Sequence, residues 1–154
     1  MGEFNIKGRI DRVEQRDEQL YIIDYKTTYT RTHLKIDLER LNPDERSSWS
    51  ESVRSIQIPL YVILYTRVHS PQHPPRGLYL LLGRAGIDRD SIEFEPLVFT
   101  PETLNAVEGF VLRVLKEINS PEVPFLPPQD MKRSCPRCNY QEVCGTKWVK
   151  GSAY

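Results

Sequence analysis

The chain has 154 residues, which is long enough for one domain with a buried core. Hydrophobic residues make up 39% and charged residues 27% of the sequence, values that are ordinary for a globular protein. No apolar run reaches the roughly 18 residues that a membrane span needs, and the start lacks a signal-peptide pattern. The formal net charge is zero, so there is no overall basic signature for nucleic acid, although local basic patches remain compatible with it. We expect a cytoplasmic protein without a membrane partner.

Two strand-like segments near the start of the chain predict a β-hairpin. They cover residues 5–15 and 19–27, and the polar residues between them are typical of a tight turn. If the turn is centred between Asp17 and Glu18, the numbers of paired residues sum to 35. This register decides which side chains of the hairpin meet.

The expected register brings two carboxylates and a lysine together. Asp11 lies directly opposite Asp24, and Lys26 shares the face of Asp24 because side chains alternate along a strand. Like charges this close repel each other unless a proton, the lysine or a cation offsets them. Mg²⁺ takes oxygen ligands from one or two carboxylates and keeps several waters. The hairpin alone therefore leaves two interpretations open, a divalent metal site or an exposed salt-bridge cluster.

The middle of the chain changes from a polar segment to a helical pattern. Residues 27–52 predict a loop or a short helix, and residues 51–68 predict a helix in which Gln57 and Tyr61 share one face. Pro59 should either kink this helix or mark its start. The expected apolar stripe contains Val53, Ile56, Leu60 and Leu64.

Two strands and a second helix are expected in the following segment. Residues 77–83 form a continuous apolar run, which predicts a central strand covered on both faces. Residues 91–99 predict another strand, in which Pro96 indicates an edge position or a bulge. Thr100 and Pro101 then begin a helix as its N-cap and first residue. Its expected buried stripe contains Leu104, Val107, Val111, Val114, Leu115 and Ile118. The order β-β-α-β-β-α predicts an α/β or α+β fold, a mixed sheet flanked by helices.

Three cysteines near the C-terminus follow the spacing Cys-x2-Cys-x5-Cys, at Cys135, Cys138 and Cys144. Thiolates at this density predict a soft metal ion or an iron–sulfur cluster. Such a site needs four ligands, and no histidine is marked as the fourth. The alternative is three free thiols, since the odd count argues against a disulfide framework.

Together these residues resemble the PD-(D/E)XK nuclease superfamily, and within it the RecB-like, AddB-type branch with a C-terminal cysteine cluster. The matching motifs, in chain order, are Gly8-Arg9-Ile10-Asp11-Arg12, Asp24-Tyr25-Lys26, Gln57-x3-Tyr61 and the three cysteines. The resemblance implies a restriction-endonuclease-like core over residues 1–125 and a cysteine-rich cluster segment over residues 126–154. The usual N-terminal helix of that core, with its additional metal ligand, is not present in these residues.

The resemblance also implies catalytic roles on the hairpin. Asp11 and Asp24 would bind Mg²⁺ or Mn²⁺, with the Tyr25 carbonyl as a further ligand. Lys26 would orient or activate the attacking water and offset charge on the transition state. Asp11, Asp24 and Lys26 are thus the expected catalytic residues. Gly8 is expected to allow close approach of backbone or DNA.

Further roles follow from the other two motifs. Gln57 and Tyr61 would contact the DNA strand, although Tyr61 has the alternative of packing in the core. The three cysteines would be the last three ligands of a [4Fe–4S] cluster whose first cysteine lies upstream of this chain. This leads to the hypothesis that the 154 residues are the C-terminal part of a larger nuclease. A cluster in this chain alone would be absent, labile or replaced by zinc.

The implied function is a metal-dependent DNA nuclease, an exonuclease that acts in DNA repair or recombination beside a helicase domain or subunit. One rival is a catalytically inactive relative that serves as a DNA-binding or scaffold module. The other is a small metal-stabilised binding protein in which the cysteine loop is the functional part. Basic residues near the cysteines would either contact phosphates or form a solvated tail; they are Lys132, Arg133, Arg137, Lys147 and Lys150.

Overall fold

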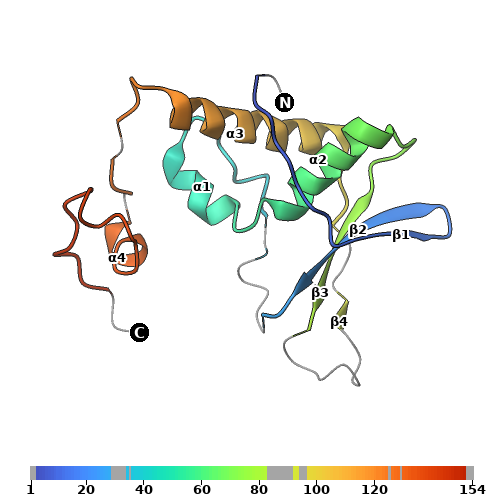
Figure 1. Cartoon of the computed structure of the whole chain (residues 1–154), viewed down its shortest axis with the longest axis horizontal. Helices are drawn as coiled ribbons and strands as arrows, with labels where there is room; N and C mark the ends of the chain where they lie inside the picture. Colours follow the sequence, from blue (N-terminus) through green and yellow to red (C-terminus); the bar gives the residue numbers. More distant parts are fainter. Residues whose placement is uncertain are drawn as a thin grey trace. The chain divides into compact units, whose positions relative to one another are not determined.

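The computed structural model describes residues 3–28, 34, 36–82, 92–93, 97–124, 126–128 and 130–151. Its elements, in chain order, are β1 (Arg12–Arg16), β2 (Gln19–Lys26), α1 (Arg46–Ser52), α2 (Gln57–His69), β3 (Arg76–Leu81), β4 (Ile92–Glu93), α3 (Pro101–Asn119) and α4 (Met131–Ser134) (Figure 1). The chain divides into two compact units, Met1–Leu115 and Lys116–Tyr154. No helix in the described ranges is sufficiently long and apolar to cross a membrane.

A four-stranded mixed sheet forms the centre of the first unit. The strand order is β1-β2-β3-β4, so β2 and β3 are the central strands. Strand β2 pairs antiparallel with β1 and parallel with β3, and β4 pairs antiparallel with β3. The parallel β2–β3 pair needs a crossover connection, and the segment that holds α1 and α2 supplies it. This arrangement confirms the predicted α/β class with its mixed sheet and flanking helices.

The hairpin has the predicted register. Every pair from Arg12↔Ile23 to Arg16↔Gln19 sums to 35, and the turn residue Asp17 adopts a positive φ of 52°. Aspartate tolerates this left-handed conformation better than most residues. The first strand is shorter than predicted, because residues 5–11 lie outside β1 and the chain bends at Asp11.

Helix α2 packs against β2 and β3, and α3 contributes Leu104 and Val107 to the same apolar core. The buried residues of this core come from β2, α2, β3, α3 and the segment between β2 and α1. They are Ile22, Leu34, Ile58, Val62, Ile63, Tyr79, Leu81, Leu104 and Val107. The approach of α2 to β3 is close: a Cβ added at Gly77 would lie 2.2 Å from Cγ2 of Ile58. Glycine is therefore required at this position to seat α2 on the sheet.

The predicted helix over residues 51–68 is divided in the structure. Helix α1 ends at Ser52, and Val53 is extended, with φ −117° and ψ 93°, and bridges to Ile36. Helix α2 begins afresh at Gln57, so Pro59 lies in its first turn, where the missing N–H has no intrahelical acceptor to lose. The start-of-helix alternative for Pro59 is confirmed.

The predicted stripe of Val53, Ile56, Leu60 and Leu64 was wrong because it was counted through the break between α1 and α2. Val53 and Ile56 lie outside α2, and Leu60 and Leu64 are only half-buried. The buried residues of α2 are instead Ile58, Pro59, Val62 and Ile63.

The strands and helix of the later segment agree in part with prediction. Strand β3 is central and mostly buried, as expected. Within the range predicted as a strand, residues 91–99, Ile92–Glu93 form the edge strand of the sheet and Leu97 forms an isolated bridge to Gly77, whereas Pro96 lies outside the described residues.

Helix α3 begins as predicted. Thr100 Oγ1 accepts a hydrogen bond from the Thr103 amide at 3.3 Å, and Thr103 Oγ1 accepts one from the Thr100 amide at 2.9 Å. The predicted stripe omitted Phe110, which is buried, and wrongly included Ile118, which is 60% exposed. The residues after Leu115 belong to the second compact unit, so the core stripe ends before Ile118.

The second unit holds α4 and a series of turns. A backbone hydrogen bond of 2.9 Å from the Thr146 amide to the Gln141 carbonyl closes the loop that carries Cys144. Among the described residues of this unit, the buried side chains are Cys135, Thr146 and Val149.

Candidate active site

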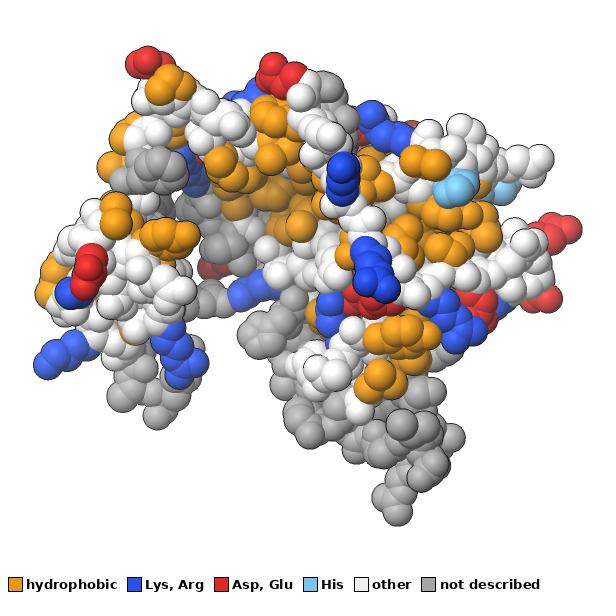
Figure 2. All heavy atoms as spheres, viewed as in Figure 1, with side chains coloured by type: hydrophobic (Ala, Val, Ile, Leu, Met, Phe, Trp, Pro, Cys, Tyr) orange, Lys and Arg blue, Asp and Glu red, His pale blue; other side chains and the backbone are white. Residues whose placement is uncertain are grey.

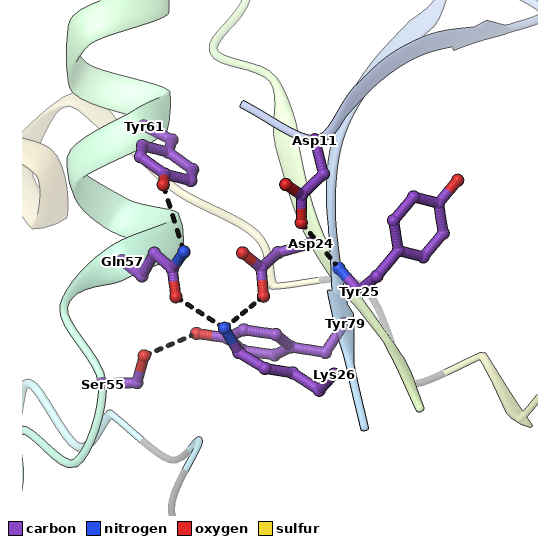
Figure 3. A network of polar contacts seen from close by, with 8 residues as sticks. All are labelled: Asp11, Asp24, Tyr25, Lys26, Ser55, Gln57, Tyr61 and Tyr79. Carbon is purple, nitrogen blue, oxygen red and sulfur yellow. Dashed lines mark hydrogen bonds and ion pairs between the residues drawn. The ribbon is translucent and has the colours of Figure 1, made fainter. Parts of the chain in front are cut away.

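The ammonium group of Lys26 lies at the centre of a polar network on the helix-covered face of the sheet (Figure 3). Lys26 Nζ is 2.5 Å from Oδ2 of Asp24 and donates a hydrogen bond of 2.6 Å to Oε1 of Gln57. Asp24 is only 1% exposed, whereas the Lys26 side chain keeps 24% of its surface accessible. The lysine therefore neutralises a buried carboxylate and still reaches solvent.

Helix α2 supplies the second side of the network. The Gln57 amide nitrogen donates a hydrogen bond of 3.1 Å to the Tyr61 phenol oxygen, which places both residues on one helical face, as predicted. The Tyr61 ring packs against the core cluster and against Gly8, where an added Cβ would lie 2.8 Å from Cε1 of Tyr61. Gly8 thus allows close approach of the Tyr61 ring, and the predicted core packing of Tyr61 is present together with its polar contact.

Asp11 lies directly before β1, and its side chain, rather than its backbone, contacts the end of β2. Its Oδ2 accepts a hydrogen bond of 3.1 Å from the Tyr25 amide. The Leu82 amide donates to the Lys26 carbonyl at 2.8 Å, so the backbone groups of Lys26 face β3. Successive residues of a strand turn these groups to opposite sides, so the N–H and C=O of Tyr25 both face Asp11. The N–H and C=O of Tyr25 and the carboxylate of Asp11 therefore lie along the β1 edge of β2, beside Asp24, the preceding residue.

Two residues of the network were not predicted from the sequence. Tyr79 is the β3 partner of Asp24, and Lys26 Nζ lies 5.9 Å from the centroid of its ring. The Tyr79 phenol donates a hydrogen bond of 3.1 Å to Ser55 Oγ, in the link between α1 and α2. Burial raises the pKa of Tyr79, and the charge of Asp24 raises it further, whereas the Ser55 contact opposes this rise. The sequence signal for Tyr79 was a side chain with a polar hydroxyl within the apolar run 77–83. Only the pairing of β2 with β3 shows that this side chain lies beside Asp24.

The outer edge of the site is basic and exposed. Arg12 donates a hydrogen bond of 3.4 Å to the Tyr25 phenol and forms an ion pair with Glu14. The hydrogen bond to Tyr25, followed by the charge of Glu14, raises the pKa of Arg12. Figure 2 shows a few acidic side chains among lysine and arginine side chains over the middle of the sheet.

The sequence model of the PD-(D/E)XK nuclease superfamily matches residues 1–145 of this chain, which include the hairpin, α2 and all three cysteines. The chain belongs to the PD-(D/E)XK nuclease superfamily. Its mixed sheet with flanking helices is consistent with the restriction-endonuclease-like fold of these nucleases. No curated protein and no solved structure matches the chain. Membership supports hydrolase activity on nucleic acids, and PD-(D/E)XK nucleases usually use Mg²⁺ or Mn²⁺.

The oxygen donors at the edge of β2 fit such an ion. Oδ2 of Asp24 is buried and lies 2.5 Å from Lys26 Nζ, which offsets its charge. In the described part of the chain, no three His, Cys, Asp or Glu side chains form a ligand group. An ion at this edge would therefore take two carboxylates, one carbonyl and water, a set that Mg²⁺ accepts.

The three cysteines of the chain do not gather into a ligand group in the structure. Cys135 is buried, whereas Cys138 and Cys144 are half-buried, and all three are free thiols. Cys138 Sγ accepts a hydrogen bond of 3.4 Å from the Tyr140 amide. Three thiols in this arrangement do not fit the four-ligand set of a zinc ion or a [4Fe–4S] cluster. The ligand role of the cysteines stays a prediction.

Proposed function

We propose that this chain is a Mg²⁺- or Mn²⁺-dependent deoxyribonuclease domain that hydrolyses phosphodiester bonds as an exonuclease. The observation that carries the proposal is the position of Lys26. Its ammonium is held between Asp24 and Gln57, and Asp11 accepts a hydrogen bond from the amide of Tyr25, the residue between Asp24 and Lys26. A positive charge beside a pair of carboxylates is the arrangement that metal-assisted phosphodiester hydrolysis needs.

Each residue of the hairpin has a distinct proposed role. Asp11, Asp24 and the Tyr25 carbonyl would hold the metal ion, which when bound supplies positive charge at the phosphate and an activated water. Lys26 would orient the attacking water and offset the negative charge that develops on the phosphorus oxygens. In this hydrolysis the water oxygen forms a bond to phosphorus while a bond from phosphorus to a sugar oxygen breaks.

Gln57 and Tyr61 are proposed to line the DNA-facing side of the site from α2. The Gln57 carbonyl oxygen already accepts from Lys26, and its nitrogen donates to Tyr61. Gln57 would thus hold Lys26 in place, and the Tyr61 phenol would contact the DNA strand. The support for this role is that Tyr61 is only half-buried although its ring packs on the core.

We further propose that the nuclease core lies within residues 1–125 and that residues 126–154 form a separate cysteine-rich segment. The basic residues of that segment, among them the exposed Arg137 and Lys150, would add phosphate contacts. Cys135, Cys138 and Cys144 would bind metal only with a ligand from outside these residues. The wider context would be DNA repair or recombination together with a helicase. Metal analysis of the purified chain for iron, sulfide and zinc tests the cysteine proposal directly.

The nuclease proposal is tested by incubating the purified chain with end-labelled single- and double-stranded DNA and Mg²⁺ or Mn²⁺. The Lys26→Ala variant should lose cleavage, whereas Lys116→Ala, which removes an exposed lysine of α3, should keep it. EDTA should abolish cleavage by the unaltered chain. Degradation of linear DNA with sparing of closed circular DNA would support the exonuclease assignment.

A second variant separates metal binding from a purely structural role of Asp11. Asp11→Asn keeps an oxygen that can accept from the Tyr25 amide but removes the charge, so it should preserve folding and lose metal-dependent cleavage. DNA binding without cleavage by the unaltered chain under all metal conditions would contradict the enzyme and favour a scaffold module.

A further inference from the structure

Tyr79 is the buried aromatic residue on which the Lys26 side chain lies. It is 4% exposed and stands next to Asp24 in the parallel β2–β3 register, on the same face of the sheet. Lys26 Nζ lies 5.9 Å from the ring centroid, within the range of a cation–π interaction. Figure 3 shows the ring alongside the Lys26 side chain, opposite Gln57.

The Tyr79 side chain is held at both ends, at the backbone and at the hydroxyl. Its Cα belongs to a central strand, and its phenol donates to Ser55 Oγ at 3.1 Å. Ser55 lies two residues before the start of α2, so this contact links β3 to the segment that leads into Gln57. A ring fixed in this way cannot rotate away from the lysine.

Lysine has a long, flexible side chain, and holding it in one geometry costs side-chain entropy. Asp24 and Gln57 restrain only the charged end of Lys26. A flat, immobile ring beside that end adds an attractive surface and removes competing rotamers.

We propose that Tyr79 is a positioning residue of the nuclease site, whose ring holds the Lys26 ammonium between Asp24 and Gln57 and is itself fixed by Ser55. This inference rests on the proposed function for its catalytic consequence, but the geometry of Lys26 can be measured without catalysis. The aromatic face, rather than the hydroxyl, is the part that acts on Lys26.

The test compares Tyr79→Phe, which keeps the ring, with Tyr79→Leu, which keeps apolar bulk without it. We expect Tyr79→Leu to lower kcat about tenfold with little change in KM, and Tyr79→Phe to retain most of the activity. Tyr65→Leu, which removes a tyrosine ring from the far end of α2, is the matched control and should leave kcat unchanged. Equal kcat for the Phe and Leu variants, or a loss in Leu that appears only as a raised KM, would overturn the proposal.

Lysine ammonium ¹H–¹⁵N spectra provide the readout that is independent of activity. The Lys26 resonance, assigned by its absence in Lys26→Ala, should be protected from exchange in the unaltered chain and in Tyr79→Phe. It should exchange faster in Tyr79→Leu, with thermal unfolding used to confirm that the variant is folded. Unaltered exchange in a folded Tyr79→Leu would refute the positioning role. An inactive unaltered chain with the expected spectra would refute the nuclease activity alone and leave the positioning role supported.

Discussion

Gly77 is where the sequence most directly controls how α2 sits on the sheet. A Cβ at this position would lie 2.2 Å from Cγ2 of Ile58 and 3.1 Å from Cε2 of Phe99. Ile58 is fully buried, β-branched and one residue from Gln57, so its methyl group cannot move aside cheaply. Gly77→Ala must therefore push α2 away from β3.

The size of the effect follows from two opposing contributions. Overpacking a tight core by one methyl group costs about 1–3 kcal/mol of unfolding free energy. Replacing glycine in a strand recovers roughly 0.5–1 kcal/mol of backbone entropy. We expect Gly77→Ala to lower the free energy of unfolding by about 1–2 kcal/mol. The displacement of α2 should also draw Gln57 from Lys26 and reduce DNA cleavage.

A double-mutant cycle with Ile58→Ala, followed by denaturant unfolding, tests this reasoning. Ile58→Ala alone should cost about 2–5 kcal/mol, because it leaves a cavity in the core. In that background Cγ2 is gone, so adding the methyl group at position 77 should cost less than about 0.5 kcal/mol. Additive losses in the two variants would refute the clash as the cause, as would an unchanged stability of Gly77→Ala.

Three further outcomes are expected. Thr100→Ala removes the acceptor of the Thr103 amide at the start of α3 and should lower the free energy of unfolding by about 1 kcal/mol, measured by denaturant titration; no change would contradict the cap. Gly8→Ala would press on the Tyr61 ring and should reduce cleavage more than DNA binding, which filter binding would separate. Because the folded-state pKa of Tyr79 lies above its unfolded value near 10, its contribution to stability is complete below that pH and is lost above it. The stability advantage over Tyr79→Phe should thus shrink as pH rises beyond about 10, and a constant difference would contradict this.

The hairpin could be predicted almost completely because its information is local. A two-residue polar turn between alternating strands specifies one register, and that register places Asp11 next to the end of β2. The helical face that Gln57 shares with Tyr61 follows equally from short-range spacing.

The break before α2 could not be predicted from apolar periodicity. Val53 leaves the helix to bridge with Ile36, a partner 17 positions earlier in the chain. The residues that α2 buries depend on where the helix restarts, and that is a tertiary effect. The stripe through Leu60 failed for this reason, while Ile58 and Val62 occupy the core instead.

The sequence by itself determined the chemistry of the candidate site: two aspartates and a lysine on a hairpin, and a glutamine and a tyrosine one helical turn apart. These follow from periods of two and of about 3.6 residues, which act over neighbouring positions. Only the tertiary structure decided that the lysine bonds to the glutamine, 31 positions away, and lies against Tyr79. Those contacts depend on the parallel pairing of β2 with β3 and on the fit of α2 over Gly77, which packing of distant segments creates.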